Sequence, residues 1–230
     1  MSSPAAALQA LLAERFPDAL PAAQRRWSAV PTGVAELDRI FPSGGLQRGR
    51  LTAWAPGIGA PALLRSALLH TVANGERSAW IDTPHMVAGA CWRSGPVLLR
   101  PRGETQALRA AEVLARSGGF ALIVLDGVHP DATAMVRLSR AAHEGGAALA
   151  LLTHVTALAT VRLTSRPVVE KYAWRRSASG EGDEVREVRI AVEARASGWR
   201  ARTELSIPVW HDDLRLSLEP RRADRRGERD

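Results

Sequence analysis

The sequence has little of several residue types on which common protein classes depend. It contains one cysteine, Cys91, so a disulfide framework is excluded and a zinc site built on cysteines is not expected. Its longest apolar runs, residues 120–125 and 147–152, are far shorter than the roughly 20 residues of a membrane-spanning helix. Residues 1–18 lack a basic segment before an apolar stretch, so they do not resemble a secretory signal. We therefore expect a cytoplasmic protein that makes no contact with a membrane.

Lysine is also almost absent, because Lys171 is the only lysine among 31 basic residues. Arginine therefore carries nearly all of the positive charge, which exceeds the negative charge by 7. Guanidinium groups bind phosphates and carboxylates through paired N–H donors, so partners of this chemistry fit the composition. A net positive charge permits nucleic-acid binding without demonstrating it, and charge that is merely solvated is the simplest interpretation.

The length of 230 residues fits one domain with extensions. Residues 5–15 show the apolar spacing of a short amphipathic helix that Pro17 ends, so residues 1–30 are expected to form an N-terminal helix and linker. Residues 31–219 are expected to form the core domain. The sequence PRRADRRGERD, residues 220–230, has the composition of a basic disordered tail.

Apolar segments and helical patterns alternate along the core up to about Thr160. The apolar segments are short and continuous, as in strands that are buried on both faces of a parallel sheet. Later segments alternate polar and apolar residues, which indicates antiparallel strands with one face in water. The fold class is therefore α/β, with a mainly parallel sheet flanked by helices and an antiparallel extension. The expected strands are residues 51–54, 78–82, 97–99, 120–125, 148–152, 161–166, 185–194 and 202–208, and the expected helices are residues 62–73, 104–116 and 131–144.

Residues 55–62 connect the first of these strands to the first helix, where ligands of parallel α/β sheets bind. A phosphate-binding loop there would read G-x-x-x-x-G-K-[ST]. Against that template, alanine or proline replaces all four defining residues and two other glycines remain: Ala55, Ala60, Pro61, Ala62, Gly57 and Gly59. The lysine charge, the hydroxyl that would hold Mg²⁺ and one backbone N–H are therefore missing, since proline has no N–H. The loop is expected to hold no nucleotide cofactor and no metal.

The segments around this loop resemble the RecA recombinase family. They read PTGVAELDRIF, SGGLQRGRLTAW, GERSAWIDTPH and RGETQALRAAEVLARSGGFALIVLDGV, and VRLTSRP follows Thr160, so the resemblance covers residues 31–208. It implies a RecA-like core in which Asp126 is a vestigial magnesium-associated aspartate. Pro84 occupies the position of the family's water-activating glutamate, and His154 that of its glutamine that senses the γ-phosphate. The two long DNA-gripping loops of the family have no counterpart, because the matching connections are short.

Within the family, the degenerate loop and the short chain resemble ImuA, the RecA-like member of bacterial mutagenesis cassettes. The resemblance implies a non-enzymatic adaptor in SOS translesion mutagenesis that associates with the nucleoid after DNA damage. The implied partners are the RecA recombinase, an ImuB-like Y-family polymerase homologue and, indirectly, an error-prone DnaE-type polymerase, with weak or no direct DNA binding. Candidate partner-binding residues form an N-terminal apolar stripe and a basic C-terminal cluster: Leu8, Leu11, Leu12, Phe16, Arg221, Arg222, Arg225 and Arg226.

Three other functions remain open from the sequence. A divergent recombinase paralogue would bind ATP in spite of the altered loop, and a bound nucleotide would reveal it. A DNA-binding protein would use its arginines without a nucleotide, and its affinity would fall steeply with salt. A cell-division inhibitor is the third alternative.

Overall fold

The computed structural model describes residues 28–87, 95–175 and 184–208. Its principal strands are β3 (Leu51–Trp54), β4 (Ser78–Asp82), β5 (Val97–Leu99), β6 (Leu122–Asp126), β7 (Ala148–Leu152), β8 (Val161–Arg175), β9 (Glu184–Ala196) and β10 (Trp199–Pro208). Its longer helices are α3 (Ala60–Ala73), α4 (Glu104–Arg116) and α5 (Ala132–Gly145). Each expected strand and helix of the core is present: five have the expected bounds, five differ by one to three residues at an end, and β8 runs nine residues further than expected.

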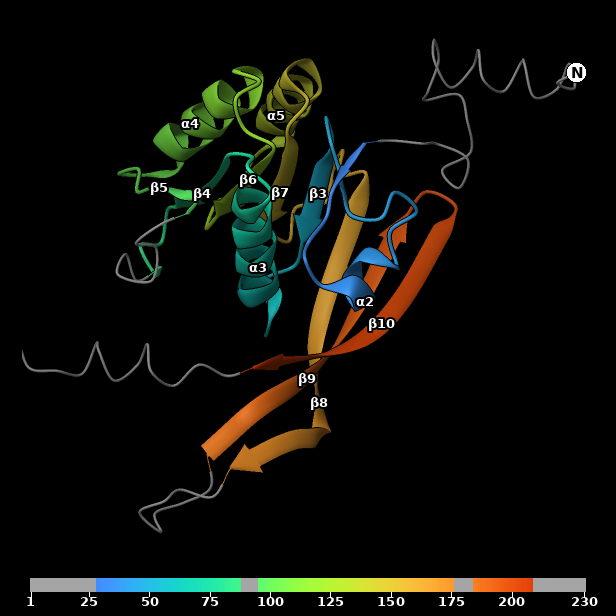
Figure 1. Ribbon diagram of the computed structural model, residues 1–230. Coiled ribbons are helices and arrows are strands. Elements are labelled where there is room, and N and C mark those ends of the chain that lie inside the picture. Colours follow the sequence, from blue (N-terminus) through green and yellow to red (C-terminus); the bar gives the residue numbers. More distant parts are fainter. Residues whose placement is uncertain (1–27, 88–94, 176–183, 209–230) are drawn as a thin grey trace, which may run out of the picture.

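These strands form one eight-stranded sheet in the order β10-β9-β8-β3-β7-β6-β4-β5 (Figure 1). The strands from β3 to β5 pair in parallel, and β8 continues the parallel pairing beside β3. From β8 onward the sheet is antiparallel, and the hairpin of β8 and β9 runs beyond the rest of the sheet in Figure 1. The expected α/β class, with a mainly parallel sheet, flanking helices and an antiparallel extension, is confirmed.

Two hydrophobic cores cover the two faces of the sheet. One joins the inner side of α3 to the face that carries Trp54, Trp80 and Leu163. The other joins α4 and α5 to the opposite face through side chains such as Ile123 and Leu149. Because β3, β4 and β7 are buried along their whole lengths, they read in the sequence as apolar runs rather than as alternating patterns.

Three short elements before β3 were not expected from the sequence. They are β1 (Ala29–Val30), β2 (Leu46–Gln47) and the single-turn helix α2 (Ala35–Asp38). β1 pairs with β2, and Val30 is buried, so the folded core includes two residues that the sequence assigns to the linker. Segments of two to four residues carry too little periodicity to be recognised from the sequence.

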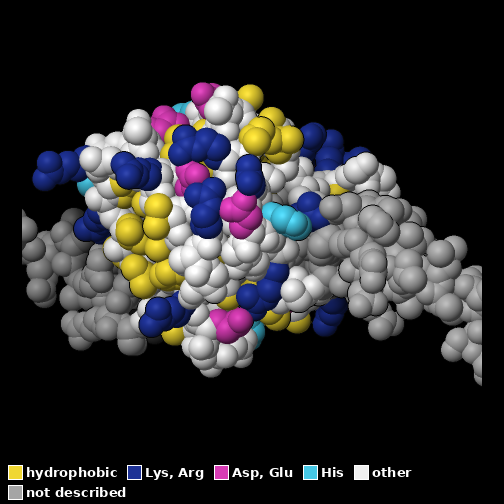
Figure 2. Space-filling model, turned by 90° about the horizontal axis from the view of Figure 1, so that it is seen from above, with side chains coloured by type: hydrophobic (Ala, Val, Ile, Leu, Met, Phe, Trp, Pro, Cys, Tyr) yellow, Lys and Arg dark blue, Asp and Glu magenta, His cyan; other side chains and the backbone are white. Residues whose placement is uncertain are grey.

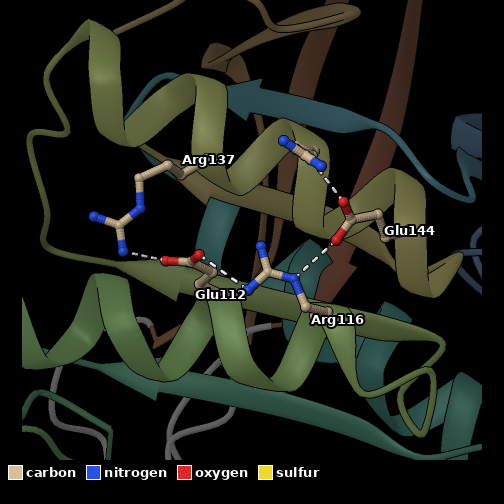
Figure 3. A network of polar contacts seen from close by, with 5 residues as sticks. Glu112, Arg116, Arg137 and Glu144 are labelled. Atoms are coloured by element: carbon tan, nitrogen blue, oxygen red, sulfur yellow. Dashed lines mark hydrogen bonds and ion pairs between the residues drawn. The ribbon is translucent and has the colours of Figure 1, made fainter.

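Helices α4 and α5 lie side by side and are joined by ion pairs on their outer surface (Figure 3). The carboxylate of Glu112 accepts hydrogen bonds from Arg137 of α5 and from Arg116 of its own helix. Arg116 also donates to Glu144 at 2.8 Å, and Arg140 donates to the same carboxylate at 2.7 Å. The pKa of Glu112 is lowered, mainly by its hydrogen bond to Arg137. Figure 2 likewise shows acidic side chains among the arginines on the face seen from above.

Candidate functional site

The position of the phosphate loop, residues 55–62, lies at the carboxyl end of β3 and leads directly into α3. Gly59 precedes the helix with φ of 87°, a left-handed conformation that favours glycine. Pro61 stands in the first turn, where a helix does not need the missing N–H. The helix therefore begins at Ala60, two residues earlier than expected, and the loop keeps a strand–turn–helix geometry without the residues that bind phosphate.

Several backbone groups of the loop are already engaged within the protein. The N–H of Ala55 donates to the carbonyl of Leu163 in β8 at 2.9 Å, and the N–H of Ala60 donates to the carbonyl of Gly57 at 3.3 Å. A methyl group placed on Gly57 would lie 3.2 Å from the carbonyl oxygen of Ser165, so this carbonyl faces the turn closely. A phosphate cradle requires N–H groups that point at the ligand. Here β8 supplies carbonyl oxygens to the same turn.

Two apolar side chains from the antiparallel extension pack against the turn at Gly59. A Cβ built on this glycine would lie 2.0 Å from Cδ1 of Ile190 in β9 and 3.3 Å from Cδ1 of Ile207 in β10. Ile190 is buried in the core beneath α3. Aliphatic side chains offer a phosphate neither charge nor hydrogen bonds, and burying a charge against them is costly. The N-terminus of α3 therefore borders a hydrocarbon surface.

Two aspartates end neighbouring strands at the same edge of the sheet as this turn, in the row that Trp54 and Leu152 begin. Asp126 ends β6 directly opposite Asp82, which ends β4. Asp82 is fully buried, and its carboxylate accepts hydrogen bonds from the N–H groups of Met86 at 2.9 Å and Val87 at 3.0 Å. Nε of Arg100 lies 3.5 Å from the same carboxylate. Asp82 thus holds the chain that leaves β4, which is a structural task.

Asp126 is in a different electrostatic position. Burial, and secondly the negative charge of Asp82, raise the pKa of Asp126 to about 6. Hydrogen bonds from the backbone of Gly127 and the side chain of Trp80 oppose this rise. A carboxyl group with a raised pKa keeps its proton to a higher pH than usual, and its protonated form is a poor magnesium ligand. The hydrogen bond from the backbone of Gly127 gives Asp126 a structural contact with the turn that follows its strand.

The remaining catalytic positions that the resemblance singles out are also filled by residues without the required chemistry. Pro84 is exposed and packs on the turn after β6, since a Cβ on Gly127 would lie 2.5 Å from Cδ of its ring. His154 is exposed just after β7. The connections after β6 and β7 span residues 127–131 and 153–160, so both are short, as expected.

In residues 28–87, 95–175 and 184–208, no group of three or more His, Cys, Asp or Glu side chains is arranged to hold a metal ion. Of the helices in those ranges, none has the length and apolar character required to span a membrane. The candidate partner-binding residues of both termini lie outside the described residues: Leu8, Leu11, Leu12, Phe16, Arg221, Arg222, Arg225 and Arg226.

Sequence reasoning missed Asp82, Ile190 and Ile207 as parts of this site. Asp82 had a recognisable signal, because it ends an apolar strand just as Asp126 does. Ile190 and Ile207 had none, since they are ordinary inward-facing residues of alternating strands more than a hundred residues from the loop. Only the folding of β9 and β10 over the start of α3 brings them there.

Comparison with known proteins finds similarity to RecA over part of the chain. A stretch of 112 residues is 36% identical to Protein RecA of Salinispora tropica, covering 44% of this chain and 31% of that protein. Protein RecA of Bifidobacterium longum is 33% identical over 110 residues, 43% of this chain and 27% of that protein. Protein RecA of Cutibacterium acnes is 34% identical over 109 residues, which cover 44% of this chain and 31% of that protein.

The chain therefore spans less than a third of the length of these relatives. No family model matches the chain. The partial similarity supports a RecA-like superfamily assignment, and the mainly parallel sheet with its antiparallel extension is consistent with a RecA-like core.

Proposed function

We propose that this chain is a RecA-like protein without ATPase activity that works as an adaptor in SOS-induced translesion mutagenesis, as its resemblance to ImuA implies. Its proposed partners are the RecA recombinase and an ImuB-like homologue of the Y-family polymerases. Through the latter it would help to recruit an error-prone DnaE-type polymerase. The observation that carries the proposal is the altered phosphate loop, where Pro61 replaces the lysine and Ile190 packs on the turn.

Phosphoryl transfer depends on positive charge and positioning rather than on covalent chemistry by the protein. In phosphate-loop enzymes that charge comes in part from the lysine and from a magnesium ion that the loop hydroxyl helps to hold. In this chain Pro61 and Ala62 stand in their places, and Pro84 stands where the family has a base. Three separate parts of one catalytic apparatus are replaced, while the strand–turn–helix frame around them remains.

A RecA-like domain that has lost its chemistry still has the shape of a filament subunit. Head-to-tail filaments use two different surfaces on each subunit, so a subunit that offers one of them can bind a filament end or recruit another protein to it. Adaptor function therefore requires the fold but not the nucleotide.

The first prediction is that the full chain does not bind Mg-ATP. Titration calorimetry should give no binding heat under conditions in which a RecA protein measured in parallel binds the nucleotide. The physical reason is the loss of the lysine charge together with aliphatic packing at Gly59. A micromolar dissociation constant for this chain would contradict the proposal and would favour a divergent recombinase paralogue.

The second prediction concerns RecA. Co-purification of the full chain with purified RecA and with an ImuB-like protein should capture both partners, and removal of residues 1–27 should abolish RecA capture. The deletion stops at residue 27 because β1 and the buried Val30 belong to the folded core. The melting temperature should therefore stay unchanged. As controls, Leu11→Asp with Leu12→Asp should lose RecA as the deletion does, and removal of residues 220–230 should retain it. RecA capture by the truncated chain would contradict this assignment.

A further inference from the structure

The antiparallel extension has one face that is rich in arginine. Side chains of β8, β9 and β10 alternate between two faces of the sheet, and residues such as Val192 and Leu205 point into the core beneath α3. The opposite face carries six arginines and two glutamates in adjoining rows. We call this set the arginine face: Arg162, Arg166, Arg189, Arg195, Arg200, Arg202, Glu193 and Glu204.

The first row of this face places three positive charges side by side. Arg162 of β8 lies directly opposite Arg195 of β9, which lies directly opposite Arg200 of β10. Like charges in directly opposite positions of antiparallel strands are destabilising. Glu193 in the next row partly offsets this repulsion, because its carboxylate forms ion pairs with both Arg195 and Arg200. The arrangement is one that stability alone does not favour.

Pairing with glutamates does not neutralise the face. Glu204 forms ion pairs with two further arginines: Nε of Arg189 lies 3.6 Å and Nη2 of Arg202 lies 3.3 Å from its carboxylate. Arg162 and Arg166 are exposed and have no acidic partner within the part of the chain that the structure describes. Six arginines against two glutamates leave an excess of four positive charges within this set, and Glu187 at its edge lowers the excess over the whole surface to three.

Glu187 is exposed one row beyond Arg189 on β9 and marks the acidic end of this surface. The excess charge is therefore concentrated in the rows nearest to the start of β8, around Arg162. The side chains of this region define the place where a ligand of opposite charge would be held most strongly.

The other side chains of the arginine face indicate what kind of ligand fits. Thr164 and Ser206 are polar and exposed, and Ala191, its apolar residue, is 3% exposed. Protein interfaces centre on tryptophan, tyrosine and arginine, and of these the described positions of the face offer arginine alone, with no aromatic side chain beside it. Guanidinium forks match phosphate oxygens, and contacts to a phosphate backbone need no apolar anchor. A positively charged sheet surface without aromatic anchors therefore fits a nucleic-acid backbone better than an acidic peptide.

We propose that the arginine face is a nucleic-acid-binding surface that contacts the phosphate backbone without reading the bases. Arg162 and Arg166 are its principal contacts, because within the described residues they have no acidic partner to give up. This surface lies outside the phosphate-loop position and does not depend on nucleotide or on the proposed adaptor role. Binding of this kind is weak, with dissociation constants of about 10⁻⁶–10⁻⁴ M at physiological salt, and it weakens steeply as salt rises.

The test is fluorescence anisotropy of the full chain with a labelled thymidine oligonucleotide and with a labelled duplex of mixed sequence. Between about 50 and 200 mM salt, the affinity should fall on the order of 100-fold if about four phosphates are contacted. The double variant Arg162→Glu with Arg166→Glu should bind at least about tenfold more weakly, and its salt slope should be smaller by about two. Circular dichroism and the melting temperature establish that this variant is folded.

The matched control is Arg77→Glu with Arg109→Glu, which makes the same change in net charge at exposed arginines away from the arginine face. It should lose less than about threefold in affinity, as expected when only the overall charge changes. Equal losses in the two double variants would overturn the proposal, because net charge alone would then explain the binding. No binding at low salt would also overturn it. Equal affinity for a polyglutamate competitor would show that the face binds acidic chains in general, and would overturn the assignment to nucleic acid.

Discussion

Replacement of Gly145 by alanine is expected to destabilise the protein by about 3 kcal/mol. Gly145 ends α5 at the place where that helix meets the end of α4, and a Cβ there would lie 1.8 Å from the carbonyl oxygen of Ala115. The two helix ends would have to separate, which would loosen the core formed by the small side chains of both helices, such as Ala111 and Ala142. Helix propensity alone predicts the opposite sign, since alanine stabilises a helix by about 1 kcal/mol relative to glycine.

Thermal unfolding followed by circular dichroism measures this effect. A loss of about 3 kcal/mol corresponds to a fall in melting temperature of roughly 6–12 °C for a domain of this size. Gly146→Ala is the matched control, because Gly146 has φ of 70° but no neighbouring atom within 4 Å of an added Cβ. It should cost only about 1 kcal/mol, from backbone strain. A Gly145→Ala variant as stable as the parent would show that α4 and α5 do not approach so closely.

The change Asp126→Asn is expected to stabilise the protein above pH 6 and not below pH 4. Burial and the charge of Asp82 raise the pKa of Asp126 to about 6 from an ordinary value of 3.8. Between these two pH values the folded state binds more protons than the unfolded state, so stability falls as pH rises through this window. Above it, the wild-type carboxylate is ionised beside another acid, and asparagine removes this cost while its carbonyl still accepts hydrogen bonds. The gain is about 1–2 kcal/mol at pH 7.5, once solvent screening of this partly exposed group is allowed for.

Urea unfolding of both proteins at pH 4 and at pH 7.5 measures the difference. At each pH the difference in unfolding free energy between variant and wild type is the stability gap. The informative quantity is how much this gap changes between pH 4 and pH 7.5. Asp131→Asn serves as the control, because Asp131 is an exposed residue that caps α5 by accepting a hydrogen bond from the N–H of Ala134, and asparagine caps equally well. Its stability gap should be nearly independent of pH. A gap that is equally insensitive for Asp126→Asn would show that Asp126 ionises as an ordinary exposed carboxyl group.

The local sequence was sufficient to predict most of the regular elements. The strands at residues 51–54 and 78–82 and the helix at residues 104–116 have the expected bounds, because each is a continuous apolar run or a helical pattern with clear ends. The strands of the extension are longer than expected, since β8 reaches Arg175 and β9 reaches Ala196. Their alternation weakens toward the ends, while pairing between the strands continues.

The sequence by itself determined the α/β class and the chemistry that the phosphate-loop position lacks. Residue identity decides whether a lysine or a metal-binding hydroxyl is present, so Pro61 and Ala62 are informative without coordinates. The tertiary structure alone decided what surrounds those residues. Contacts such as that of Ile190 with Gly59, and the alignment of Arg162 with Arg195, depend on the register of strands far apart in the chain. Register is set by the packing of whole strands against the core, and the local sequence does not record which distant strand becomes a neighbour.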